Sequence, residues 1–154
     1  MSDAPTVLIF EAPLGSDLYA QALRLREAIL RKPLGLTVTE EELADDAVRQ
    51  HFCAVAFGAV VGTVSLRPLD EAALHLKQMA VVEARRRERV GARLLAHVET
   101  WATDAGYRLM VIHARIGAEG FYLKLGYAQE GDAFDENTIP HVRVIKRLAR
   151  RHEE

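Results

Sequence analysis

The residues best suited to chemistry form a basic cluster between a predicted strand and a predicted helix. Four arginines and one glutamate occupy positions 85–89, after the apolar run Met79–Val82 and just before Gly91. The first backbone N–H groups of a helix have no partner inside the helix, and the helix dipole favours negative charge there. The segment is therefore suited to bind a phosphate group. The alternative is a charged loop exposed to solvent.

The hydrophobic pattern around this cluster predicts a mixed α/β fold. Apolar residues at helical spacing predict helices over 17–31, 89–105 and 117–125, and a short acidic helix within 40–50. Runs of β-branched and other apolar residues predict strands over 7–10, 51–57, 60–67, 74–82, 109–114, 128–134 and 141–148. A tight turn at Gly58-Ala59 would join the second and third strands.

The bulk composition indicates one domain without a large charged surface. The chain has 154 residues, 49% of them hydrophobic, and a net charge of −2, which argues against a general nucleic-acid binder. Cys53 is the only cysteine, so we expect a reducing cytoplasm and a thiol packed in the core. We expect no membrane partner, because no apolar stretch approaches the roughly 20 residues needed to span a bilayer. No metal is predicted, because no cluster of His, Cys and carboxylates has ligand spacing.

Two segments resemble motifs of the GNAT superfamily of N-acetyltransferases. Arg86–Gly91 (RRERVG) is similar to its acetyl-coenzyme-A motif, Q/R-x-x-G-x-G/A. Ala118–Tyr127 (AEGFYLKLGY) is similar to its A-x-x-F-Y-x-K-x-G-F helix, at a matching distance and after a predicted strand. The resemblance covers residues 6–148 and implies a single GNAT domain, with a mixed, mostly antiparallel sheet flanked by helices and a charged tail over 149–154. The implied cosubstrate is acetyl-CoA.

Two further segments resemble the glyphosate N-acetyltransferase-like branch of small bacterial acetyltransferases. Pro140-His141 matches a Pro-His pair that opens the last strand of that branch. Leu25–Arg31 (LREAILR) matches the L-R-x-x-I-L-R pattern of its first helix. The resemblance implies a small-molecule acceptor.

One motif position departs from the family pattern, because Arg89 stands where the superfamily has its first motif glycine. A residue with a Cβ adopts positive φ only at a cost, and the similar branch carries a long basic residue at this place. We therefore expect ordinary right-handed geometry at Arg89, with its side chain near phosphate. The alternatives are a solvated arginine at the helix start, or a weakened site.

The resemblance also implies which residues contact acetyl-CoA. The backbone of Met79–Val81 would pair with the pantetheine arm, and amides between Arg86 and Ala92 would face the pyrophosphate. The implied cofactor-binding residues are Met79, Ala80, Val81, Arg86, Arg87, Glu88, Arg89, Val90, Gly91, Ala92, Phe121 and Lys124.

Two residues are candidates for proton transfer. His141 is the candidate general base, because an imidazole titrates near neutral pH and the similar branch uses a histidine at this position. The alternative is a strand-end histidine that only bonds a carbonyl. Tyr122 matches a tyrosine that many of these enzymes place near the thioester sulfur, so it is the candidate acid. Its alternative is an aromatic residue that packs on the sheet, although we expect Phe121 to be the packing residue.

Three cations match substrate-binding positions of the glyphosate-acetylating branch, and these are Arg31, Lys77 and Arg115. Together they would attract carboxylate or phosphonate groups. The alternative is three independent surface charges. The resemblance therefore implies an enzyme that moves the acetyl group of acetyl-CoA directly to the amine of a small acidic molecule, without an acyl-enzyme. A protein or peptide N-acetyltransferase and a catalytically silent CoA-binding module are the alternatives, and a homodimer is expected only by analogy with the fold.

Overall fold

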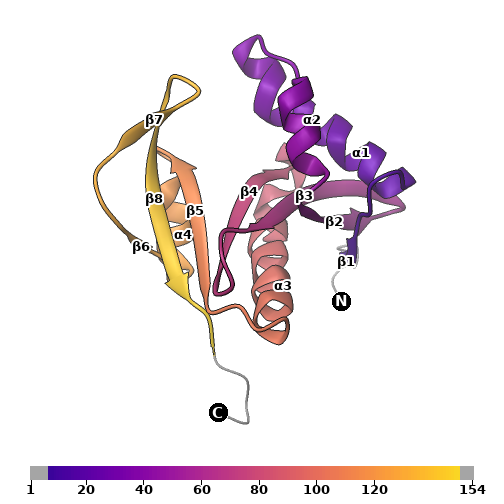
Figure 1. Ribbon diagram of the computed structural model, residues 1–154. Coiled ribbons are helices and arrows are strands. Elements are labelled where there is room, and N and C mark those ends of the chain that lie inside the picture. Colours follow the sequence, from indigo (N-terminus) through magenta and orange to yellow (C-terminus); the bar gives the residue numbers. More distant parts are fainter. Residues whose placement is uncertain (1–6, 150–154) are drawn as a thin grey trace. The chain divides into compact units, whose positions relative to one another are not determined.

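The computed structural model describes residues 7–149, apart from the side chains of Arg86 and Arg87. Hydrogen bonds order the strands β1-β2-β3-β4-β5-β8-β6, and β7 pairs with β8 (Figure 1). The strands are β1 (Leu8–Glu11), β2 (Gln50–Ala56), β3 (Ala59–Pro68), β4 (Ala73–Val81), β5 (Leu109–Arg115), β6 (Ala128–Gln129), β7 (Phe134–Glu136) and β8 (Ile139–Arg147). The helices are α1 (Asp17–Arg26), α2 (Glu40–Asp46), α3 (Val90–Asp104) and α4 (Glu119–Lys124), with a π-helical η1 (Glu27–Arg31) and 3-10 segments η2 (Lys32–Leu34) and η3 (Glu83–Glu88). The predicted mixed, mostly antiparallel sheet with flanking helices is confirmed.

The chain divides into two compact units. The first unit extends to Arg67 and includes Gln78–Val98, and the second unit comprises Pro68–Lys77 and the chain from Glu99 onward. The single GNAT domain over 6–148 stays a prediction. The predicted charged tail over 149–154 lies, beyond its first residue, outside the described residues.

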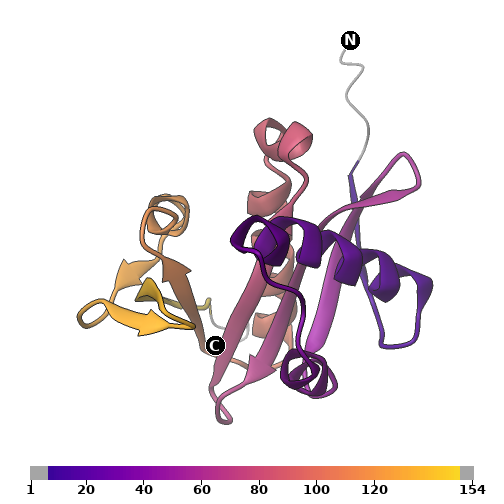
Figure 2. The same ribbon diagram turned by 90° about the horizontal axis from the view of Figure 1, so that it is seen from above.

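The first unit is built on the alternation of side chains along β2. Cys53 is fully buried in a cluster to which Leu18 and Leu25 of the α1 region contribute. Its neighbour Phe52 points the other way, and its ring lies 5.8 Å from the ring of His97 on α3. Because successive strand residues face opposite sides, α1 and α3 cover opposite faces of these strands (Figure 2). The expectation that Cys53 packs in the core is confirmed.

The second unit is built on the pairing of β8 with β5, from Leu109↔Arg147 to Arg115↔His141. The Lys146 ammonium donates to the carbonyl of Leu125, immediately after α4, at 2.9 Å. The even-numbered residues of β5 and β8 therefore share the face that α4 covers. The odd-numbered residues share the opposite face. The odd-numbered residues of β4 lie on the same face as the odd-numbered residues of β5 and β8, because His75 pairs in register with Val111 of β5.

Two tight turns differ from the prediction. Ala56 pairs with Ala59, so the first turn is Phe57-Gly58, with φ of 52° and 74°, and the prediction of Gly58-Ala59 is wrong. The single strand predicted over 128–134 is also wrong: the segment contains β6, a loop and the start of a β7–β8 hairpin. Its turn is Asn137-Thr138, with φ of 53° and 65°. A turn with both central residues at positive φ usually signals itself by Asn-Gly or Asp-Gly, and this sequence lacks that signal.

Replacing Thr138 with glycine is expected to raise the free energy of unfolding by about 0.5–1 kcal/mol. The left-handed conformation costs a residue with a Cβ about 1–2 kcal/mol, and the extra freedom of glycine in the unfolded chain offsets part of the gain. Urea unfolding measures the change. The control variant Thr138→Ala keeps a Cβ and is expected to gain less, so a glycine variant that is less stable than the alanine variant would contradict this assignment of strain.

Candidate active site

The predicted cofactor segment is a strand, a 3-10 turn and a helix start in the first unit. The β4–β5 ladder ends at the pair Leu76↔Ile112, and β4 continues to Val81. Gln78 interrupts this continuation with a φ of 61°. Its side-chain amide is buried, and neither its oxygen nor its nitrogen has a hydrogen-bond partner among the described residues. The strand geometry therefore changes next to Met79–Val81, where the resemblance implies pantetheine binding.

Arg89 adopts the conformation that a glycine would take at this place. Its φ is 61°, and the residue is exposed. The expectation of ordinary right-handed geometry is therefore wrong. The chain leaves η3 and enters α3 within one residue, and a single left-handed residue makes this change of direction at a cost of about 1–2 kcal/mol. Arg89 therefore has the left-handed conformation expected of the motif glycine, although the residue itself is an arginine.

The start of α3 presents backbone donors next to this turn. The first helical hydrogen bond after the turn runs from the amide of Arg93 to the carbonyl of Arg89, at 3.0 Å. The preceding amides of Val90, Gly91 and Ala92 belong to the first helical turn, where N–H groups have no acceptor inside the helix. These groups, with the helix dipole and the exposed Arg89, are suited to an anion.

The four arginines of the cluster are not equivalent. Arg85 donates to both carboxylate oxygens of Glu88, at 2.9 and 3.1 Å, and its guanidinium lies 5.2 Å from the centre of the Phe57 ring. The Arg85–Glu88 ion pair therefore partly neutralises one cation of the cluster. It also gives Glu88, a predicted cofactor-binding residue, a partner within the chain. The side chains of Arg86 and Arg87 lie outside the described part of the structure. Within the cluster, Arg89 is thus the exposed arginine that the structure places at the helix start.

The second unit holds His141 in one defined orientation. Its Nδ1 lies 2.7 Å from the carbonyl oxygen of Ile139. A carbonyl only accepts hydrogen bonds, so Nδ1 carries the proton and Nε2 of the neutral ring carries a lone pair. Nε2 lies 3.7 Å from Oε2 of Glu136, and the His141 side chain is 8% exposed. The carbonyl bond of the alternative hypothesis is therefore present, and it leaves Nε2 able to accept a proton.

Glu136 is a site residue that the sequence did not indicate. Its Oε1 lies 2.9 Å from Nδ1 of His113. Burial would raise the pKa of this carboxyl, but the His113 hydrogen bond, the charges that His113 and His141 carry when protonated, and the Lys77 charge outweigh burial and lower it. The group is therefore a carboxylate at neutral pH. Recognising the Asn137-Thr138 turn would have placed Glu136 near His141, because the two residues lie diagonally across a tight hairpin.

Three of the predicted site residues share one face of the second unit. His141, Arg115 and Lys77 are all odd-numbered, Arg115 pairs in register with His141, and Lys77 lies close enough to lower the pKa of Glu136. This face therefore holds the candidate base and two of the three predicted substrate-binding cations. Phe121, Tyr122 and Lys124 belong to α4, which covers the opposite face.

Tyr122 is the buried aromatic residue of α4. Tyr122 is 8% exposed, whereas Phe121 is 39% exposed. The expectation that Phe121 is the packing residue is therefore wrong. The Tyr122 ring packs edge-on against Tyr127, with centroids 5.9 Å apart. Burial raises the pKa of Tyr122 to about 12, so its hydroxyl stays protonated at neutral pH. This state fits both the packing alternative and the role of proton donor.

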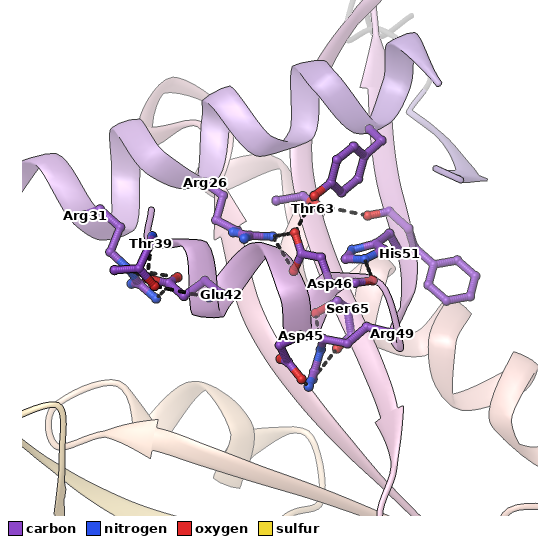
Figure 3. A network of polar contacts seen from close by, with 12 residues as sticks. Arg26, Arg31, Thr39, Glu42, Asp45, Asp46, Arg49, His51, Thr63 and Ser65 are labelled. Carbon is purple, nitrogen blue, oxygen red and sulfur yellow. Dashed lines mark hydrogen bonds and ion pairs between the residues drawn. The ribbon is translucent and has the colours of Figure 1, made fainter. Parts of the chain in front are cut away.

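Arg31 lies in the first unit with an internal partner. Its Nε and Nη2 donate to the carboxylate of Glu42, at 3.1 and 2.7 Å (Figure 3). Glu42 is fixed in turn by a capping box with Thr39 at the start of α2. The guanidinium fork is therefore occupied by a carboxylate from this chain. A substrate contact of Arg31 stays a prediction.

Comparison with known proteins decides the family. A family model described as "Acetyltransferase (GNAT) domain" matches residues 27–148. The chain belongs to the GNAT acetyltransferase family. It is 26% identical over 138 residues to "Uncharacterized protein YyaT" of Bacillus subtilis (strain 168), covering 88% of this chain and 92% of that protein.

Solved structures share this GNAT fold. The structure of a "putative N-acetyltransferase from Lactobacillus plantarum" has a TM-score of 0.82 and 25% identity, over 93% of this chain and 99% of the other. A GNAT family acetyltransferase from Elizabethkingia anophelis, solved with acetyl-CoA bound, has a TM-score of 0.71 and 20% identity, over 92% of this chain and 98% of the other.

Within residues 7–149, no helix has the length and apolar character needed to cross a membrane. The same residues contain no group of three or more His, Cys, Asp or Glu arranged to hold a metal ion.

Proposed function

We propose that this GNAT domain is an N-acetyltransferase that transfers the acetyl group of acetyl-CoA directly to the amine of a small acidic molecule, as the glyphosate N-acetyltransferase-like branch does. One observation carries the proposal: the oriented lone pair of His141 lies on the same strand face as Lys77 and Arg115. A base removes the proton of an amine, and cations attract a carboxylate or phosphonate.

The first unit fits the phosphates of acetyl-CoA. The first-turn amides of α3, the left-handed turn at Arg89 and the exposed Arg89 side chain would hold the pyrophosphate, and Met79–Val81 would hold the pantetheine arm. The cofactor supplies an acetyl group activated as a thioester. The structure solved with acetyl-CoA bound, that of the Elizabethkingia anophelis protein, supports this choice of cofactor.

The roles of His141 and Tyr122 follow from the two faces on which they lie. His141 takes a proton from the acceptor amine on the odd-numbered face. Tyr122, with its pKa raised to about 12 by burial, donates a proton toward the leaving sulfur from the α4 side.

Direct transfer is supported by the state of Cys53. Formation of an acyl-enzyme on a cysteine requires a nucleophilic thiolate. Cys53 is fully buried in the first unit, and burial raises the pKa of its thiol to about 11. The thiol is therefore protonated and inaccessible at neutral pH.

An acceptor panel of similar-sized amines tests the proposed function. Thiol release from acetyl-CoA is measured with four amines. 2-Aminoethylphosphonate and aspartate carry an acidic group, ethanolamine carries an uncharged hydroxyl instead, and putrescine carries a second amine. We expect kcat/KM to be at least about 10-fold higher for an acidic amine, since one charge-assisted contact is worth about 1.5–3 kcal/mol. Turnover of ethanolamine or putrescine without turnover of the acidic amines would contradict the substrate class. CoA binding without any amine-dependent release would identify a silent module, and release with peptides alone would identify a peptide acetyltransferase.

A further inference from the structure

We propose that Glu136 and His141 together form the receptor for the positively charged amino group of the acceptor. The ammonium nitrogen would lie beside the line that joins Oε2 of Glu136 to Nε2 of His141, about 2.8–3.0 Å from each atom, and would donate one hydrogen bond to each. This inference rests on the proposed function and specifies which atoms recognise the amine. The acceptor is then a zwitterion, with its ammonium at this pair and its acidic group toward the cations of the same face.

The distance between the two atoms is the first observation. Oε2 and Nε2 lie 3.7 Å apart, which is longer than a hydrogen bond. Because Nδ1 of His141 is committed to the Ile139 carbonyl, Nε2 of the neutral ring accepts and does not donate. Two acceptors at this distance do not bond to each other, but one donor with several N–H bonds can reach both. An ammonium group offers up to three N–H bonds and a positive charge.

The second observation is that both groups are held in place. The carboxylate is fixed through Oε1 by Nδ1 of His113, which leaves Oε2 directed toward His141. The Phe134 ring stacks on the His141 ring, with centroids 6.0 Å apart, and meets the His113 ring edge-on at 5.0 Å. The pair therefore keeps its spacing without the ligand, which reduces the entropic cost of binding.

The third observation is the charge balance on this face. Glu136 faces His113 of β5 and His141 of β8, and it feels the charge of Lys77 of β4. The ring of His75 lies 4.5 Å from the ring of His113. Arg115 of β5 lies opposite His141 in the β-ladder, and Arg143 of β8 is paired with Glu130. Within the described residues, Glu136 is the carboxylate that lies beside both His113 and His141.

Proton transfer at this pair conserves the local charge. The N–H bond of the ammonium breaks, a new N–H bond forms at Nε2 of His141, and the amine nitrogen keeps its electron pair for attack. One positive charge remains beside the Glu136 carboxylate before and after the step, on the ammonium first and on the imidazolium afterwards. The carboxylate thus stabilises both sides of the transfer.

The variant Glu136→Gln tests this role, because glutamine still accepts the His113 hydrogen bond but has no charge. We expect the KM for 2-aminoethylphosphonate to rise at least 10-fold, with the KM for acetyl-CoA unchanged. Inhibition by the isosteric alcohol, 2-hydroxyethylphosphonate, is measured alongside. The wild type should prefer the amine over the alcohol, and the variant should lose that preference. Asp135→Asn, on the same strand but exposed, is the matched control and should behave as the wild type.

Two results would overturn the inference. One is an unchanged preference for the amine over the alcohol in Glu136→Gln, and the other is an equal weakening of both ligands. Calorimetric titration of the CoA-loaded protein with both compounds measures the same preference without turnover. If the wild type acetylates no amine, the proposed function fails, and the titration still decides whether Glu136 recognises an ammonium group.

Discussion

Replacing His141 with alanine is expected to lower kcat/KM for the acceptor amine by about 10²–10⁴-fold, the usual contribution of a positioned general base. The ring is buried, its Nδ1–H is bonded to the Ile139 carbonyl, and its Nε2 is left as an acceptor beside a carboxylate. Alanine removes the only group of this pair that accepts a proton near neutral pH. Because the ring is buried and His141 pairs with both β5 and β7, the Tm of the variant is measured beside its rate to show that the fold is kept.

The pH dependence separates a lost base from a distorted site. A base acts by removing the ammonium proton, so the defect should shrink as the pH approaches the value at which the amine loses this proton unaided. The acidic limb of kcat/KM, which protonation of the base produces, should disappear in the variant. The control His97→Ala, at an exposed position of α3, should keep both the rate and the limb. A His141→Ala enzyme with wild-type kcat/KM and an unchanged acidic limb would show that another group is the base.

Replacing Asp46 with asparagine is expected to lower the free energy of unfolding by about 3–5 kcal/mol, the cost of leaving a buried charge without its partner. The Arg26 and Asp46 side chains are 4% and 0% exposed, and Nη1 lies 3.0 Å from Oδ2 (Figure 3). Nε and Nη2 of Arg26 are buried with no hydrogen-bond partner among the described residues. Asp46 is therefore the counter-charge that makes burial of this guanidinium tolerable.

Asp46 joins α1, α2 and β2 through its carboxylate and its backbone carbonyl. The Tyr19 hydroxyl donates to Oδ2 of Asp46, and burial together with this bond raises the pKa of Tyr19 to about 12. Nε2 of His51 lies 2.9 Å from the carbonyl oxygen of Asp46 (Figure 3). Loss of the charge should therefore loosen the packing of α1 and α2 on the strands of the first unit.

Thermal and urea unfolding measure this effect, with a fall in Tm of roughly 10 °C expected for a chain of this size. The control Asp132→Asn changes an exposed carboxylate of the second unit and should leave Tm unchanged. Adding Arg26→Met to Asp46→Asn removes the stranded charge, so it should recover at least half of the lost stability. If Asp46→Asn costs less than about 1 kcal/mol, the pair is not the buried counter-charge described here.

The core of this fold was predictable because its signals are local. Val90, Leu94 and Val98 recur at helical spacing, and all three are fully buried on α3. The β7–β8 hairpin was not predictable in this way. Its first strand has three residues, its turn uses Asn137-Thr138, and its stability comes from pairing with residues that the turn itself brings close. Local propensity carries no signal for such tertiary pairing.

The candidate site shows the same division between local and distant information. The sequence indicated His141 and the basic segment, whose motifs lie within short stretches. It could not indicate the His113–Glu136 bond, which joins residues 23 positions apart, or the Arg31–Glu42 pair, which depends on how α2 packs. At Arg89 the rule against positive φ predicted the wrong geometry, because the turn between η3 and α3 requires that conformation of whichever residue occupies it.

The most direct measurement is mass spectrometry of an acidic amine, such as 2-aminoethylphosphonate, after incubation with the full chain and acetyl-CoA. An enzyme that transfers acetyl directly with His141 as base should yield the N-acetylated amine and an equal amount of free CoA thiol. The protein itself should carry no acetyl group, and His141→Ala should yield little product. Acetylation of the protein chain, or CoA binding without an acetylated amine from any acceptor class, would contradict direct transfer to a small amine.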